Sequence, residues 1–255
     1  MDPEYGSFAD NPARFQTTRW SAILVAAQSQ LPGSQAALSQ LCRLYWYPLY
    51  AFARRRGQGP IDAQDLTQGF FLHLLEHRAL KRVEPLKGKF RSFLLASFQN
   101  FISDETSRAR SLKRGGNQEF VFLDAEDAEN RYRHEPSDIL TAEKIYDARW
   151  AMALLGHALE CLRLEYAARN AVSQFDVLQV FVGVGKEGQS PPSYEEVANS
   201  LHISVSAAKT LIHRFRKQYT ALVREEIGRT VTDPAEIDQE IHALCEALIA
   251  AEGRI

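Results

Sequence analysis

The stretch SYEEVANSLHISVSAAKTLIHRFRKQY at 193–219 combines a tight break between two helices with a dense set of basic and polar side chains. Ser193 and Glu196 have the spacing of a capping box, in which hydroxyl and carboxylate satisfy free amides of the first helical turn. The apolar spacing predicts one helix that ends at Leu201 and a second that starts at Ser204. This pattern favours a helix-turn-helix, whose second helix fits the DNA major groove. The outward polar side chains of that second helix are Ser206, Lys209, Thr210, His213, Arg214 and Arg216.

The same stretch is also compatible with an ordinary helical hairpin that carries a solvated basic face. His202 stands at the turn position that glycine often fills, and histidine adopts a positive φ only at some cost. Both interpretations stay open on this stretch alone.

A second basic stretch, LKGKFRSFLLASFQNFISDETSRARS at 86–111, interleaves basic residues with aromatic ones. Aromatic rings can stack on unpaired bases while Lys and Arg contact phosphates. The helical spacing of Phe90, Phe93, Phe98 and Phe101 is typical of a hydrophobic core, however. We therefore expect the basic ends of this helix to be the better candidates for contact with nucleic acid.

The net charge of −2 hides two segments of opposite sign. Residues 81–114 carry nine Lys and Arg against three acids, a net of +6, and residues 119–147 carry nine acids against three bases, a net of −6. The basic segment could attract a polyanion, although two solvated surfaces would give the same counts. The acidic segment is a candidate shield that keeps the basic segment away from nonspecific DNA.

Metal and catalytic chemistry find little support in the sequence. His73 and His77 are four residues apart, as are His157 and Cys161, which is a possible metal spacing. Neither pair is accompanied by an HExxH motif or a further ligand pair, and the glycine-rich residues 183–188 lack the preceding strand and Lys-Ser/Thr ending of a phosphate loop. We expect no metal, no cofactor and no enzymatic activity.

The composition is that of a soluble globular protein, with 45% hydrophobic and 24% charged residues. No apolar run approaches the roughly 18 residues of a membrane span, and the N-terminus has no signal-peptide pattern. Three cysteines, Cys42, Cys161 and Cys245, stand in apolar helical surroundings, which argues against a disulfide framework. We expect a cytoplasmic protein without membrane contact.

Apolar residues recur at helical spacing through most of the chain, and no segment alternates strictly, so we expect an all-α protein. Two helical domains are predicted, at 34–114 and 142–228. The acidic and nearly aperiodic residues 115–141 are predicted to form a flexible linker between them. Residues 1–33 are an N-terminal extension in this interpretation, and 229–255 are a helical tail.

Within these parts the periodicity predicts individual helices, the second of which Pro48 should kink or divide. The tail helix either stabilises the second domain or folds back and regulates access to partners, and both alternatives stay open. The predicted helices cover 18–27, 34–56, 62–77, 90–110, 141–166, 173–182, 193–201, 204–227 and 233–250.

Three stretches together resemble a known family. They are DAQDLTQGFFLHLL at 62–75, GKFRSFLLASFQNFISDETSRAR at 88–110 and SYEEVANSLHISVSAAKTLIHRFRK at 193–217. In this order they are similar to the signature stretches of bacterial extracytoplasmic-function (ECF) RNA polymerase sigma factors. The resemblance covers 34–113 and 146–226. It implies a sigma region 2-like helical bundle, followed by a sigma region 4-like helix-turn-helix domain.

The resemblance implies that the protein is a promoter-specificity subunit of RNA polymerase. Its partners would be core RNA polymerase, contacted through the clamp of the largest subunit and through the flap, and promoter DNA. An anti-sigma factor is a further candidate partner. Polymerase-binding positions would be Asp62, Asp65, Leu66, Gln68 and Phe71. Positions that melt and hold the minus-ten element would be Lys89, Phe90, Arg91, Asn100, Arg108 and Arg110. The minus-thirty-five element would be read by the six outward residues of the second helix of the helix-turn-helix.

Three positions depart from the family pattern. Gly69 stands where an acid is frequent, Ala96 where many members carry a base, and Leu211 where Arg is common. The promoter sequence therefore does not carry over from relatives. The alternative function is that of a helix-turn-helix regulator that acts without polymerase, which would leave the helix at 62–75 unexplained.

Overall fold

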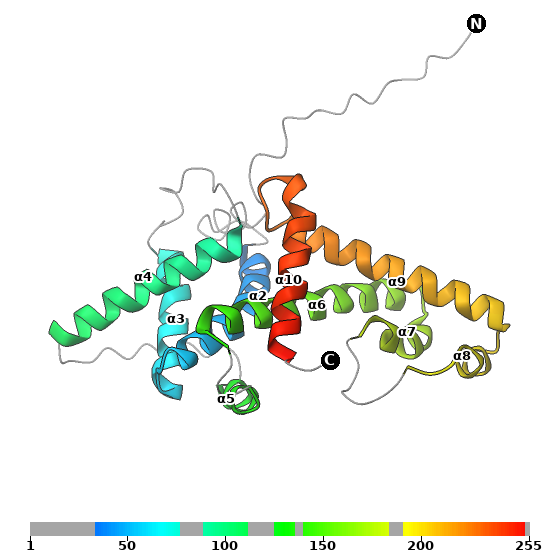
Figure 1. The fold of residues 1–255 in the computed structure, drawn as a ribbon, viewed down its shortest axis with the longest axis horizontal. Helices are drawn as coiled ribbons and strands as arrows, with labels where there is room; N and C mark the ends of the chain where they lie inside the picture. The colour runs from blue at the N-terminus through cyan, green and yellow to red at the C-terminus, as the bar shows by residue number, and fades with distance from the viewer. Residues whose placement is uncertain (1–33, 77–88, 112–124, 136–139, 184–190, 253–255) are drawn as a thin grey trace, which may run out of the picture.

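The computed structural model describes residues 34–76, 89–111, 125–135, 140–183 and 191–252, and every regular element in them is helical (Figure 1). The prediction of an all-α protein is confirmed. The predicted helix at 18–27 lies outside the described residues. In chain order the elements are α2 (Ser34–Arg55), α3 (Pro60–Glu76), α4 (Phe90–Ser111), α5 (Ala125–Arg133), α6 (Ala142–Ala168), α7 (Val172–Leu178), η3 (Gln179–Val182), α8 (Tyr194–Ser200), α9 (Val205–Gly228), η4 (Pro234–Glu236) and α10 (Ile237–Glu252).

The helix α2 runs through Pro48 and is not divided there. A proline inside a helix removes one backbone hydrogen bond, which normally favours a break. Here the residues around Pro48 are buried, and Tyr45, Leu49 and Phe52 have no exposed surface. Packing of this stripe outweighs the local preference for a break.

Two clusters of buried apolar side chains lie along the molecule. The first joins α2, α3, α4, α5, the beginning of α6, the end of α9 and α10, and it contains the ring contact of Tyr45 with Trp150 at 6.0 Å. The second joins the rest of α6 to α7, α8 and α9, and it contains the contact of Tyr166 with Phe215 at 5.6 Å. Because α6 is continuous across both clusters, the two halves of the chain share a helix (Figure 1).

The acidic segment expected as an aperiodic linker contains the helix α5, which lies against α2. Glu129 of α5 accepts hydrogen bonds from Tyr50 at 2.6 Å and from two nitrogens of Arg54 at 3.0 Å. Just after α5, Glu135 accepts hydrogen bonds from Tyr47 at 2.7 Å and from Arg149 at 2.5 Å. Glu129 and Glu135 are thus paired with Arg54 of α2 and Arg149 of α6.

The tail forms the helix α10, as predicted, and it crosses α6 near the middle of the molecule (Figure 1). Leu244 and Ala251 are buried in the first cluster, and Ile237, Ile241 and Leu248 are partly buried against it. Glu240 also points inward and has no exposed surface. None of the helices in the described part of the chain is both long and apolar enough to cross a membrane.

Candidate nucleic-acid interface

A short turn joins α8 to α9 at the place where the sequence predicts a helix-turn-helix, and we keep that name for this unit. Ser193 caps α8: its backbone N–H donates to Glu196 Oε2 at 2.6 Å, and its Oγ accepts from the backbone N–H of Glu196 at 3.2 Å. These hydrogen bonds lower the pKa of the Glu196 carboxyl. His202 lies in the turn with φ of 53°, and Ser204 caps α9. The local chemistry predicted for this unit is therefore present.

Packing of α8 against α9 fixes which face of α9 is free. Val197 and Ala198 of α8 are buried with Ala208, Ile212 and Phe215 of α9. All six residues proposed to read duplex DNA are exposed on the other side. They are Ser206, Lys209, Thr210, His213, Arg214 and Arg216.

Two of the exposed basic side chains on α9 are held in place by neighbouring residues. The Lys209 ammonium lies 5.3 Å from the centre of the Tyr194 ring. Arg216 donates from Nε to the carbonyl of Phe181 at 3.0 Å and lies over the Phe181 ring. Pre-positioned cations lose less conformational entropy when they contact a phosphate.

One stripe of exposed residues along α4 carries no charge, although the neighbouring Asp104 is also exposed. Ser92, Ala96, Asn100, Ser103 and Ser107 are all exposed and recur every three or four residues. Asn100 is therefore available to a ligand, whereas the side chains of Arg108 and Arg110 lie outside the described residues.

Phe90 is fully buried, and its ring lies 5.6 Å from that of Tyr45. Phe98 is also fully buried, next to Phe52 and Phe70. In this structure Phe90 belongs to the core and cannot stack on a base, as the helical spacing of the phenylalanines indicated.

Lys89 and Arg91, proposed for the minus-ten element, are paired with two carboxylates, and 24% of the Lys89 side chain is still exposed. Arg91 pairs through Nε with Glu240 of α10 and through Nη1 with Asp147 of α6. Lys89 Nζ lies 2.6 Å from the other oxygen of Glu240. The Arg91 guanidinium also lies 5.6 Å from the Trp150 ring centre, and the Tyr146 hydroxyl donates to the Arg91 carbonyl at 2.9 Å. In this structure the positive charges of Lys89 and Arg91 are therefore paired with carboxylates and not available to pair with DNA phosphates.

The pKa values of the three charged groups in this cluster shift for different reasons. Burial disfavours the charged form of Arg91, but its hydrogen bond to Glu240 and the charge of Asp147 outweigh burial and raise its pKa. Burial also opposes ionisation of Glu240, yet hydrogen bonds from Arg91 and Lys89 lower the pKa of that carboxyl. For Asp147 burial prevails over the attraction of Arg91 and raises the pKa. Glu240 is therefore the carboxylate that this cluster stabilises best.

On α3, Asp62 and Asp65 are exposed and Leu66 and Gln68 are half-buried. Phe71 is buried, with its ring 6.1 Å from that of Phe70. The two acids lie near Ile61, whose side chain is 73% exposed, which is unusual for an isoleucine. The two acids are therefore the part of the predicted polymerase-binding set that is accessible to a partner.

Gly69, which replaces a frequent acid, has a packing reason. A Cβ at this position would lie 3.3 Å from the Phe101 ring, which is closer than usual contact. The absence of a side chain lets α3 and α4 approach each other.

Residues 43–112 match the family model of sigma-70 region 2. These residues are similar to sigma-70 region 2, and we refer to them below as the region 2 domain. The match supports a sigma factor of the sigma-70 family, with a role in promoter recognition together with RNA polymerase. The comparisons find no match to the chain among curated proteins or solved structures.

The sequence did not predict that Glu240 and Asp147 pair with Lys89 and Arg91 at the start of α4. Glu240 lies three residues after Ile237 and four before Leu244, on the apolar stripe of the tail helix. A carboxylate on a buried stripe requires a cation partner. That signal was present in the sequence, but it does not reveal that the partner lies in α4.

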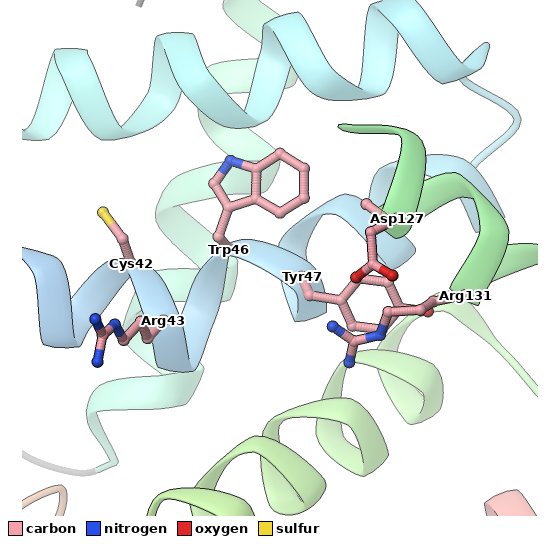
Figure 2. Close-up of a pocket in the computed structure, with 7 residues that line it drawn as sticks. Cys42, Arg43, Trp46, Tyr47, Asp127 and Arg131 are labelled. Carbon is pink, nitrogen blue, oxygen red and sulfur yellow. The ribbon is translucent and has the colours of Figure 1, made fainter. Parts of the chain in front are cut away.

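A shallow pocket lies beside the region 2 domain, between α2 and α5 (Figure 2). Its lining includes Cys42, Trp46 and Asp127, with the Arg131 guanidinium 3.9 Å from the Tyr47 ring centre. Burial raises the pKa of the Cys42 thiol to about 11, so the thiol is protonated at neutral pH. A protonated thiol is a poor nucleophile, and the pocket does not support covalent catalysis.

His157 and Cys161, noted for their spacing, meet Glu226 of α9, and one possible ligand atom of each lies within 4.8 Å of the others. His157 Nε2 is 3.7 Å from Cys161 Sγ and 3.8 Å from Glu226 Oε2. Burial, with the charge of Glu226, raises the pKa of the thiol, and Glu226 also accepts from Arg229. These contacts are explained as polar packing between α6 and α9, and we assign no metal to them.

Proposed function

We propose that this protein is a sigma factor of the extracytoplasmic-function type, which binds core RNA polymerase and directs promoter recognition, DNA melting and transcription initiation. The observation that carries the proposal is the presence in one chain of a region 2 domain and, after it, a helix-turn-helix with an exposed basic face. This order supports two DNA contacts made by one protein.

In this proposal the outward face of α9 contacts the minus-thirty-five element in the major groove. Arg214 and Lys209 would neutralise phosphates or contact base edges, while Ser206 and Thr210 are short enough to approach the bases. The face of α4 around Asn100 would meet the unpaired minus-ten strand. Because both contacts are on one chain, binding of one raises the effective concentration of the other.

The exposed acids of α3 would bind the clamp of the largest polymerase subunit. The test is retention of core polymerase by immobilised protein, with Asp62→Asn and Asp65→Asn compared with Asp176→Asn. Asp176 is also exposed but lies on α7, in the other half of the chain. We expect retention by the wild-type and Asp176→Asn proteins and at least a severalfold loss with Asp62→Asn and Asp65→Asn.

Failure of the wild-type protein to retain core polymerase would contradict this proposal. Tight binding to duplex DNA without polymerase would then favour the helix-turn-helix regulator.

A further inference from the structure

The carboxylate of Glu240 lies between the two bases at the start of α4. Its Oε1 accepts from Arg91 Nε, and its Oε2 lies 2.6 Å from Lys89 Nζ and 3.4 Å from Arg91 Nη2. Two anionic oxygens that bridge a lysine and an arginine reproduce the contacts of a phosphate group with the same pair. Glu240 has no exposed surface, so this position is fully occupied.

We propose that α10 is an autoinhibitory helix, in which Glu240 occupies the position of a DNA phosphate at Lys89 and Arg91. This inference rests on the proposed function, because it assumes that these bases contact the minus-ten strand. The protein described here is then a closed form. DNA can contact the side chains of Lys89 and Arg91 only after α10 dissociates from α4 and α6.

The place of Lys89, directly before the first residue of α4, supports the proposal. Lys89 directly precedes the exposed stripe that runs through Ser92, Ala96 and Asn100, at the same three- to four-residue spacing. A DNA strand bound along this stripe would meet Lys89 at the N-terminal end of α4. The helix α10 therefore covers one end of the track and leaves the part around Asn100 open.

The contact of α10 is suited to exchange. Leu244 and Ala251 are buried and Ile237, Ile241 and Leu248 are partly buried against the first cluster, whereas the opposite side of α10 is exposed, so one apolar stripe holds the helix. A buried ion pair contributes little net stability because desolvation offsets the attraction, but it is costly to leave one charge unpaired. A phosphate that replaces Glu240 keeps both cations paired, so the exchange avoids that cost.

The second carboxylate at this site, that of Asp147, gives Arg91 and Lys89 different roles. Asp147 holds Arg91 from α6, and Trp150 of α6 lies beneath the guanidinium, independently of α10. Arg91 therefore stays oriented after α10 leaves. Lys89 loses its partner on α10 and becomes the base that is newly available.

The experiment compares Glu240→Gln with Glu246→Gln in the full chain. Glu246 lies on the same helix, is exposed and pairs only within α10, with His242 at 3.3 Å, so it is the matched control. Two measurements are made without polymerase. The first is the acetylation rate of Lys89 by mass spectrometry. The second is the affinity for a single-stranded oligonucleotide as a function of salt concentration.

We expect Glu240→Gln to accelerate acetylation of Lys89 severalfold and to tighten oligonucleotide binding. The slope of log K against log salt should become steeper by about 0.7 for each phosphate contact recovered. The double variant Glu240→Gln with Lys89→Gln should lose most of this gain. Glu246→Gln should match the wild type in both measurements.

Equal acetylation and equal salt slopes for wild type, Glu240→Gln and Glu246→Gln would overturn the proposal. If Glu240→Gln does not fold, hydrogen exchange of the wild-type protein decides. Amides of 237–252 should lose protection when polymerase and promoter DNA bind, and retained protection would contradict the inference. Failure of core polymerase to bind at all, with the acetylation result intact, would reject the proposed function and not the masking contact.

Discussion

Arg54 of α2 donates two hydrogen bonds of 3.0 Å to the carboxylate of Glu129, and this ion pair docks α5 onto the region 2 domain. Tyr50 adds a third hydrogen bond to the same carboxylate at 2.6 Å. Both partners of the pair are mostly covered, with 19% and 15% of the side chains exposed. An acidic segment of poor helical periodicity is thus ordered by contacts with distant bases.

Replacement of Glu129 by Ala should therefore destabilise the docking of α5. Hydrogen bonds to charged groups contribute about 1.5–3 kcal/mol, and we expect a loss of about 1–2 kcal/mol in the free energy of unfolding. Asp127 lies on the same helix and is exposed, so Asp127→Ala is the control. Denaturant unfolding that gives equal losses for both variants would contradict the assigned role of Glu129.

The helix-turn-helix offers a test of the strain at His202. A φ of 53° is unfavourable for histidine but not for glycine, so His202→Gly should leave stability unchanged or raise it by up to about 1 kcal/mol. Ser200→Gly, at a helical position in α8, should instead lower stability by about 0.5–1 kcal/mol. Thermal unfolding checks the pair, and a larger loss for His202→Gly than for Ser200→Gly would contradict the account.

Two glycines within helices should respond oppositely to alanine. At Gly69 a Cβ would approach Phe101 to 3.3 Å, so Gly69→Ala should lower the unfolding free energy by about 1 kcal/mol. At Gly156 of α6 no atom lies within 4 Å of the added Cβ, and Gly156→Ala should stabilise by about 0.5–1 kcal/mol through helix propensity. Opposite signs in chemical denaturation are expected. Two changes of the same sign would argue against close packing at Gly69.

The two acids at Arg91 should contribute to pH dependence with opposite signs. The folded pKa of Glu240 is below its ordinary value of 4.5, so its contribution to stability is present above pH 4.5 and is lost as the pH falls through the folded pKa. The folded pKa of Asp147 is above 3.8, so this group instead lowers stability as the pH rises from 3.8 through the folded pKa. Relative to wild type, Glu240→Gln should therefore flatten the acid loss of Tm, and Asp147→Asn should steepen it. The same change of slope for both variants would contradict the assignment.

Local signals predicted much of this structure. The capping box at Ser193, the break near His202 and the apolar stripes of α3 and α4 depend on neighbouring residues, and the structure contains all of them. The ordered helix α5 and the ion pairs of Lys89 and Arg91 depend on partners far along the chain: Glu129 is 75 residues from Arg54, and Glu240 is 149 residues from Arg91. A single sequence reveals which side chain needs a partner but not which residue supplies it.

The sequence did not reveal, for a related reason, that α6 belongs to both clusters of buried side chains. Its periodicity predicts a helix from 141 to 166, in agreement with Ala142–Ala168. Which of its faces packs on α2 and which on α9 is decided by tertiary contacts, so the sequence suggested two separately packed halves. In the structure Leu154 belongs to the first cluster and Ala158 to the second, one turn apart on the same helix.

Transcription by core polymerase from a library of promoter fragments, with and without this protein, tests the central claim most directly. A sigma factor predicts new transcripts that require the protein, start at defined positions and share two upstream elements. Arg214→Ala should weaken selection of the distal element, and Asn100→Ala that of the proximal one. An identical set of start sites in the presence and absence of the wild-type protein would contradict the account.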